Sequence, residues 1–203
     1  MSIQLIRSQI RKYVPLALRT ELNPDDLSKD DLLRYRLTHA ALGFTTETAE
    51  LFCGKDNINE LEELGDLSWY LALPTNLLQG MRLPLKLGEG PLRNPWDTSV
   101  EVQLQANLGH LVRLAGELAD FSKRFTYYRK DPDWSQVQFT VSQAWMAVIK
   151  AVKLRDGDFQ QVLDANIAKL KSRYPDRFTC KLAVQRNVAK ERKVLEQHIG
   201  KTE

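Results

Sequence analysis

Apolar residues recur every three or four positions along most of this chain, and that spacing is typical of helices. The first such stripe runs from Leu5 to Val14, after which Pro15 interrupts or bends the helix. No run alternates apolar and polar side chains in the way that a half-buried strand requires. The sequence therefore predicts an all-α fold, built as a helical bundle.

Turn and capping residues divide the chain into expected helices. Ser28 predicts the N-cap of a helix over residues 29–53. The next helix should start at Asp56 or Asn57 and reach about residue 73, because Pro74 permits a kink or a stop. Further helices are expected at about residues 98–128, 135–154, 159–174 and 183–199.

The 203 residues are interpreted as one all-α domain with several internal parts. Residues 79–97 carry Gly or Pro at six positions and show no helical period, so they predict a linker. The parts are a helical unit at 28–78, this linker at 79–97, a second unit at 98–155, a helix with a motif at 158–178, and a basic C-terminal helix at 183–199.

The second unit contains an echo of the first. Glu117 and Asp120 flank an alanine at the same spacing as Glu47 and Glu50, and in each unit a second helix with a Trp follows. This predicts a duplicated two-helix unit whose second copy is degenerate, because its later helix has no acids. Chance similarity between two amphipathic helices is the alternative.

The net charge of +3 is too small to indicate nucleic acid or a membrane surface as the partner. It hides an asymmetry, because residues 39–66 hold seven acids against one base, whereas residues 169–203 hold ten Lys or Arg against four acids. The first segment could hold cations and the second could meet anions. The alternative is two solvated helix faces.

Two pairs of acids stand three positions apart on neighbouring predicted helices: Glu47 with Glu50, and Glu63 with Asp66. Residues at this spacing share a helix face, and helices joined by a short loop usually pack antiparallel, which can bring the pairs together. Four converging carboxylates repel one another unless a cation lies among them. Oxygen ligands suit Mg²⁺ or Mn²⁺, and a magnesium site with open positions indicates phosphate chemistry.

A di-iron carboxylate bundle would also use paired Glu residues, but it requires Glu-x-x-His. None of the three histidines has Glu three positions before it, so the sequence lacks the histidine ligands that a di-iron site requires.

A second motif lies near the C-terminus, where Asn166, Lys169 and Arg173 share one helix face. An amide and two cations on one face could grip a triphosphate, and Arg offers a bidentate fork. The alternative is a solvated last turn whose cations complement the helix dipole.

Taken together, these motifs resemble the all-α nucleoside triphosphate pyrophosphohydrolases of the MazG-like and dimeric dUTPase superfamily. The family pattern is E-x-x-E, a gap of a dozen or so residues, then E-x-x-D. Here E-T-A-E at 47–50 and E-L-G-D at 63–66 are separated by twelve residues, and N-I-A-K-L-K-S-R-Y-P-D-R-F follows at 166–178. The resemblance covers about residues 36–73 and 158–178.

The resemblance implies Mg²⁺-dependent hydrolysis of a nucleoside or deoxynucleoside triphosphate to the monophosphate and pyrophosphate, for control or cleaning of the nucleotide pool. It makes Glu47, Glu50, Glu63 and Asp66 the metal ligands, and Glu47 or Glu50 the general base.

The resemblance also assigns five substrate-binding residues: Lys55, Lys169 and Arg173 for the phosphates, and Tyr70 and Asn166 for the sugar or base. His39 is expected to pack or to position a helix rather than to catalyse. Short family members run almost directly from the E-x-x-D helix into the Asn-Lys-Arg helix, whereas about 100 residues intervene here. Whether the C-terminal motif serves its own chain or a partner therefore stays open.

We expect a homodimer or higher homo-oligomer, because helical pairs with such apolar faces tend to bury them. Cys53 and Cys180 fit a reducing cytosol, and no signal peptide or membrane span is recognised, so the expected location is the cytoplasm. The alternative function is a non-catalytic helical protein that binds a nucleotide or a partner. Nucleic acid is not expected, because no nucleic-acid-binding motif is present.

Overall fold

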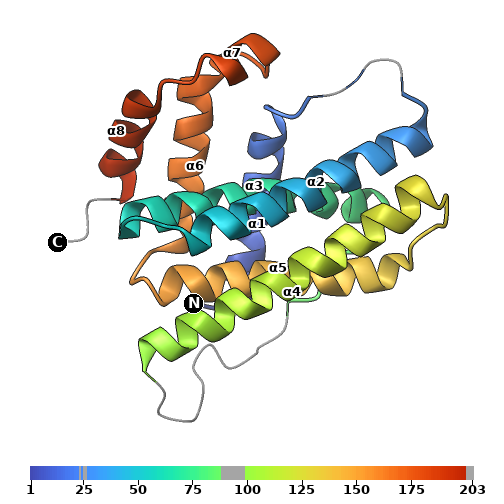
Figure 1. Ribbon diagram of the computed structural model, residues 1–203, viewed down its shortest axis with the longest axis horizontal. Coiled ribbons are helices and arrows are strands. Elements are labelled where there is room, and N and C mark those ends of the chain that lie inside the picture. The colour runs from blue at the N-terminus through green and yellow to red at the C-terminus, as the bar shows by residue number, and fades with distance from the viewer. Residues whose placement is uncertain (23, 25–26, 88–98, 200–203) are drawn as a thin grey trace.

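The computed structural model describes residues 1–22, 24, 27–87 and 99–199 (Figure 1). Over these residues the chain forms eight helices and no strand, which confirms the predicted all-α fold. In chain order they are α1 (Ile3–Leu18), α2 (Lys29–Phe52), α3 (Asn57–Gly80), α4 (Val100–Tyr127), α5 (Trp134–Lys153), α6 (Phe159–Arg173), α7 (Cys180–Val184) and α8 (Val188–Ile199). None of the described helices combines the length and the apolar character needed to cross a membrane.

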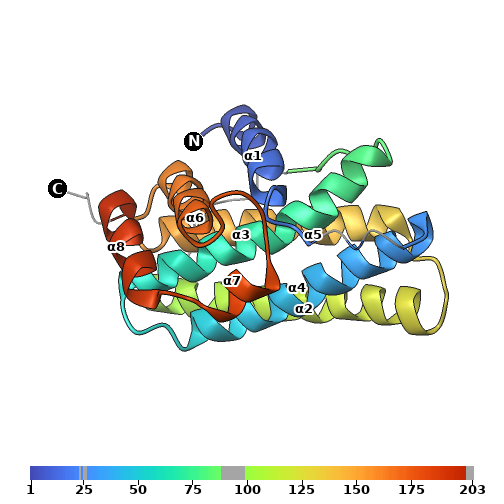
Figure 2. The same ribbon diagram turned by 90° about the horizontal axis from the view of Figure 1, so that it is seen from above.

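The four longest helices, α2 to α5, run alongside one another and form a bundle (Figure 1). Helix α2 packs against α3 and α4, and α5 packs against the same two helices from the other side of the bundle. Helices α1, α6 and α8 lie across α3 as a second layer (Figure 2). The acidic face of α2 and α3 and the basic end of the chain thus come to lie on the same side of the molecule.

The core fills the space between these helices with large apolar side chains. Phe44, Leu64, Leu71, Leu118 and Trp145 come from four different helices, and each is 0% exposed. Burial of a side chain of this size stabilises the fold by roughly 1.5–3 kcal/mol. The indole N–H of Trp145 is satisfied within the core, because it donates to Oγ1 of Thr75 at 2.9 Å.

Polar side chains cap the helices that carry the site. The Ser28 hydroxyl accepts a hydrogen bond from the Asp31 amide at the start of α2, as predicted. Asp56 accepts one from the Asn59 amide at 2.8 Å at the start of α3. Each cap contributes about 1 kcal/mol and fixes the residue at which the helix begins.

Helix α3 continues past Pro74 to Gly80, so the predicted end near Leu73 is wrong. Pro74 has no N–H, and one hydrogen bond to the preceding turn is therefore missing. Leu77 and Leu78 lie beyond Pro74 and are buried, and this packing outweighs the lost bond.

The predicted helix over residues 183–199 is divided in two. Helix α7 ends at Val184, and α8 begins only at Val188. Oδ1 of Asn187 accepts a hydrogen bond from the amide of Lys190 at 3.0 Å, so Asn187 acts as the N-cap of α8. The break at residues 185–187 separates a short exposed helix from one that packs against α6.

The predicted linker at 79–97 is only partly described. Gln79 and Gly80 belong to α3, and residues 88–97 lie outside the described residues. Between them the chain follows α5, because the Lys86 amide donates to Oγ of Ser142 at 3.0 Å and Leu87 is buried.

Helices α4 and α5 correspond to the predicted second unit. Glu117 and Asp120, the acids that repeat the spacing of Glu47 and Glu50, pair there with basic side chains. Glu117 pairs with Arg113, and Asp120 pairs with Lys123 at 2.8 Å and with Arg124. These two carboxylates are therefore neutralised near the surface. The duplication itself stays a prediction.

Candidate functional site

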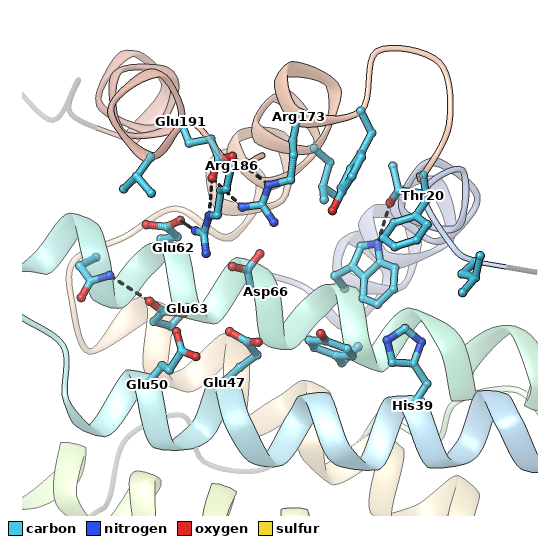
Figure 3. A pocket seen from close by; sticks show the side chains of 18 of the residues that line it. Thr20, His39, Glu47, Glu50, Glu62, Glu63, Asp66, Arg173, Arg186 and Glu191 are labelled. Carbon is cyan, nitrogen blue, oxygen red and sulfur yellow. Dashed lines mark hydrogen bonds and ion pairs between the residues drawn. The ribbon is translucent and has the colours of Figure 1, made fainter. Parts of the chain in front are cut away.

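A cavity of about 530 Å³ opens between the bundle and the second layer (Figure 3). Helices α2 and α3 form its floor, and α6, α8 and the segment between them form its roof (Figure 3). Six of the nine predicted site residues line this cavity: Glu47, Glu50, Glu63, Asp66, Tyr70 and Arg173.

Three carboxylates meet on the floor. Glu47 and Glu50 from α2 and Glu63 from α3 each offer an oxygen, and these oxygens all lie within 4.8 Å of one another. Glu50 is exposed, Glu47 is half-buried and Glu63 is buried, so the cluster opens toward the cavity. The side-chain amide of Asn59 donates a hydrogen bond from Nδ2 to Oε1 of Glu63 at 2.9 Å and fixes the Glu63 side chain. The structure thus brings together three of the four predicted metal ligands.

The electrostatics of this cluster favour a cation. Burial, and after it the negative charges of Asp66 and Glu50, raises the pKa of the Glu47 carboxyl to about 9. Burial also raises the pKa of the Glu63 carboxyl to about 7, and Asp66 adds to the effect. Such shifts arise because like charges face one another in a poorly solvated place. An oxygen-coordinated divalent cation would relieve them, so the donor set fits Mg²⁺ or Mn²⁺.

The fourth predicted ligand, Asp66, lines the cavity but is not one of these three carboxylates. Its Oδ1 accepts a hydrogen bond from the Asn166 amide at 2.7 Å, and its Oδ2 pairs with Nζ of Lys169. The same Nζ donates to Glu62 at 3.0 Å. Asp66 is therefore held between the carboxylate cluster and a buried cation.

Asn166 and Lys169 do not line the cavity, and this corrects their predicted role as substrate contacts. They are 2% and 1% exposed. Burial lowers the pKa of the Lys169 ammonium, but Asp66 and Glu62 outweigh it and leave the pKa raised, so Lys169 stays charged. Both side chains contact Asp66 rather than open space.

Lys55 also departs from its predicted role. It is exposed in the loop between α2 and α3 and is not among the residues that line the cavity. Its amide donates to the side chain of Asn59 at 3.2 Å, which places it at the start of α3. The Lys55 ammonium is therefore not part of the cavity wall.

Two arginines face the floor from the roof. Arg173 binds Glu191 through two hydrogen bonds, with Nε to Oε1 at 2.8 Å and Nη2 to Oε2 at 2.5 Å (Figure 3). Arg186 binds the same carboxylate at 3.0 Å and lies 3.8 Å from Glu62 on the floor. Two guanidinium groups of the roof therefore share the Glu191 carboxylate, while a third arginine that lines the cavity, Arg192, pairs with Asp56 at 3.1 Å and with Glu196 at 2.8 Å.

Aromatic side chains line the other end of the cavity. Trp69 and Tyr70 lie with ring centroids 4.9 Å apart, and His39 contacts both rings. The Trp69 indole donates to the carbonyl of Ala17 and to Thr20, both at 3.0 Å, which fixes the ring. Burial lowers the pKa of His39, so the imidazole is neutral at physiological pH and packs, as the sequence predicts.

Several residues of this site lie outside the motifs that the sequence presents. Glu62, Arg186 and Glu191 line the cavity, and none of them belongs to the helix-face motifs. The net positive charge of residues 169–203 was the available signal for Arg186. Glu191 gave no signal, because an acid in a basic helix is expected to make local surface pairs.

Comparison of the chain with protein-family models, with curated proteins and with solved structures found no match. The fold and the cavity by themselves define a helical bundle whose acidic floor is suited to a cation and whose roof is suited to an anion.

Proposed function

We propose that this protein is a Mg²⁺-dependent nucleoside triphosphate pyrophosphohydrolase of the MazG-like and dimeric dUTPase superfamily. The observation that carries the proposal is the cluster of Glu47, Glu50 and Glu63, whose oxygens lie within 4.8 Å of one another at the cavity floor. The charge distribution supports it, because arginines face this cluster across the cavity. A metal complex of a triphosphate carries both signs of charge and would complement both surfaces.

The cavity also has a place for the rest of a nucleotide. Its volume of about 530 Å³ lies within the range of pockets that enclose small ligands. The rings of Trp69 and Tyr70 at the opposite end from the arginines suit a flat base and a sugar. A nucleoside triphosphate would therefore lie with its phosphates over the acidic floor and its base against the aromatic rings.

Each group then has a defined task. A bound Mg²⁺ would neutralise phosphate charge and supply an activated water at neutral pH. Glu47, Glu50 and Glu63 would hold the ion, while Arg173 would bind phosphate oxygens. Glu47 or Glu50 would act as the general base that accepts a proton from water. Lys169 and Asn166 would orient Asp66 beside the cluster.

A panel of nucleoside and deoxynucleoside triphosphates tests the proposal. The purified protein should release the monophosphate and pyrophosphate in Mg²⁺, and chelation should abolish release. Glu50→Gln should reduce the rate at least 100-fold, because the exposed ligand is lost while the fold is untouched. Product identity should be read by chromatography, since release of inorganic phosphate alone would contradict cleavage between the α- and β-phosphates.

The second helical pair offers a matched control. Glu117 stands at the corresponding position of the echo in α4, where it pairs with Arg113 instead of other carboxylates. Glu117→Gln makes the same chemical change and should leave the rate within twofold of the wild type. Equal loss of activity in both variants would count against a specific role for the cluster.

One observation favours a second candidate, a protein that binds a metal–nucleotide complex without turnover. Lys169 and Asn166 occupy the Asp66 carboxylate, so among the residues that the structure describes it is Glu47, Glu50 and Glu63 that remain to hold a cation. Calorimetry separates the two candidates. Mg²⁺-dependent nucleotide binding without any product over hours would favour this alternative and exclude the enzyme.

We also propose that the protein forms a homo-oligomer in the cytoplasm. Leu42 and Phe52 on α2 are 63% and 72% exposed, and a second copy of the chain would cover them. Cys53 and Cys180 are free thiols, as expected in a reducing compartment. Analytical ultracentrifugation should show a species of at least twice the chain mass, and a monomer at micromolar concentration would contradict the first part.

A further inference from the structure

The contacts between α6 and the C-terminal arm, which we define as residues 174–199, contain a feature that the proposed function does not need. Glu191 from α8 reaches into the cavity roof and takes both arginines there as partners. It is 3% exposed, so the carboxylate is almost fully enclosed. Burying a charge is costly unless ionic partners compensate for it, and here two guanidinium groups do so.

The geometry of this contact is that of an anion bound to a guanidinium fork. The two oxygens of Glu191 meet Nε and Nη2 of Arg173 at 2.8 and 2.5 Å. Two oxygens of one phosphate group bind the same fork in the same way. Oε2 of Glu191 also accepts from Arg186 at 3.0 Å, so one carboxylate edge is shared by two cations.

The charges are not balanced by Glu191 alone. Arg186 also pairs with Glu62 on the floor at 3.8 Å, a longer contact than its 3.0 Å pair with Glu191. Glu62 is already paired with Lys169 at 3.0 Å. A more highly charged anion could replace Glu191 on the two arginines, and it would lie next to the floor on which Glu47, Glu50 and Glu63 meet.

The segment that carries Arg186, between α6 and α8, buries few side chains of its own. Helix α7 has no buried residue. Val184 at the end of α7 and Val188 at the start of α8 are 85% and 62% exposed. The segment is held at both ends, because Arg19 donates to the carbonyls of Tyr174, Pro175 and Asp176, and α8 is anchored through the buried Leu195 and Ile199. Few apolar contacts oppose a displacement of the chain between α6 and α8.

We propose that Arg173 and Arg186 form a subsite for the terminal phosphates of the substrate, and that Glu191 occupies this subsite as an internal anion until the phosphates displace it. This assignment rests on the proposed function for the identity of the ligand. It adds a phosphate ligand, Arg186, and a competing group, Glu191, both outside the family-like motifs. The class of ligand is a pyrophosphate group, either as the end of a triphosphate or as the released product.

The subsite makes opposite predictions for its two kinds of residue. Arg186→Gln removes a cation that binds the anion, and the affinity for inorganic pyrophosphate should fall by about tenfold or more. Glu191→Gln keeps the hydrogen-bonding shape but removes the competing charge, and the affinity should rise by about tenfold or more. A merely structural ion pair between α6 and α8 would give a loss of stability in both variants and no gain of affinity in either.

The experiment is isothermal titration of the wild type and the variants with inorganic pyrophosphate in the presence of Mg²⁺. Lys190→Gln is the matched control, because Lys190 is exposed on α8 and its change alters the net charge as Arg186→Gln does. Its affinity should stay within twofold of the wild type. If Glu191→Gln fails to fold, the difference between Arg186→Gln and Lys190→Gln decides the matter.

Nucleotide hydrolysis by the same wild-type preparation keeps the two proposals apart. If no triphosphate is hydrolysed but pyrophosphate affinity falls in Arg186→Gln and rises in Glu191→Gln, the subsite stands and the proposed activity is wrong. If triphosphates are hydrolysed but both variants bind pyrophosphate as Lys190→Gln does, the subsite is wrong and the activity stands. Absence of pyrophosphate binding in both the wild type and Glu191→Gln would also overturn the subsite.

Discussion

The side-chain amide of Asn166 donates a hydrogen bond of 2.7 Å to the carboxylate of Asp66, although the two residues lie 100 positions apart in the chain. The oxygen of the same side-chain amide is also bound, which fixes the direction of its nitrogen. The hydroxyl of Tyr13 donates to Oδ1 of Asn166 at 2.7 Å. A chain of polar contacts thus runs from α1 through α6 to the cavity floor on α3, and it sets the position of Asp66.

Removing the first member of this chain should cost stability. Tyr13→Phe deletes a buried hydroxyl and leaves Oδ1 of Asn166 without its donor. The free energy of unfolding should fall by about 1–2 kcal/mol. Urea denaturation followed by circular dichroism measures this change. Tyr127→Phe is the control, because Tyr127 is 74% exposed and its loss should change stability by less than about 0.5 kcal/mol.

Lys169 is expected to be a structural cation rather than a direct phosphate ligand. Lys169→Met keeps the length of the side chain but leaves Asp66 and Glu62 without their shared partner. Because a half-broken buried ion pair typically costs 3–5 kcal/mol, the unfolding free energy should fall by about 3 kcal/mol. The exposed neighbour gives the control Lys171→Met, which should be nearly neutral. If Lys169→Met unfolded at the same urea concentration as the wild type, the buried role would be wrong.

Much of the fold follows from local rules that a sequence exhibits directly. The apolar period predicts the helices, and Ser28 and Asp56 begin α2 and α3 through contacts within one turn. The i,i+3 spacing also predicts which acids share a face, and Glu47, Glu50 and Glu63 do meet. Each of these results depends on residues that are close in the chain or on neighbouring helices.

The failures involve contacts between distant segments. The spacing of Asn166 and Lys169 predicts a shared helix face, but it does not predict how deeply that face is buried. Packing of α6 on α3 buries both side chains. Glu191 reaches the cavity because α8 turns back along α6, which no local pattern indicates. Pro74 fails to end α3 because buried residues after it outweigh one lost hydrogen bond. In each case tertiary packing overrides a local preference.

Gly43 should be essential for the position of Tyr70. A Cβ at residue 43 would lie only 1.9 Å from Cε1 of Tyr70, so the ring would have to move. Gly43→Ala should lower the unfolding free energy by about 1–3 kcal/mol, and it should raise KM for a nucleotide because Tyr70 lines the cavity. Thermal unfolding and steady-state kinetics measure the two effects.

Another helical glycine provides the opposite expectation. A Cβ at Gly116 in α4 would meet no atom within 4 Å. Gly116→Ala should therefore stabilise the protein by about 0.5–1 kcal/mol, because alanine loses less backbone entropy in a helix. If both substitutions stabilised the protein, the close contact between Gly43 and Tyr70 would not be a constraint on the sequence.

The carboxylate cluster should make the metal-free protein less stable in base. The pKa values of Glu47 and Glu63 are raised from 4.5 to about 9 and about 7, so the folded state binds protons that the unfolded state has released. The stability due to this excess is complete below pH 4.5 and is lost as pH rises through 7 and then 9. The sign is opposite to that of a carboxylate held by a salt bridge.

Thermal unfolding in a chelator should therefore show a lower Tm at pH 9 than at pH 6. Glu47→Gln removes the most strongly shifted group, so its Tm should change less over the same range and should exceed that of the wild type at pH 9. Mg²⁺ should raise the wild-type Tm at pH 8 and have little effect at pH 5, where protons already occupy the cluster. A Tm that rose between pH 6 and pH 9 without metal, in the wild type but not in Glu47→Gln, would contradict the proposed electrostatics.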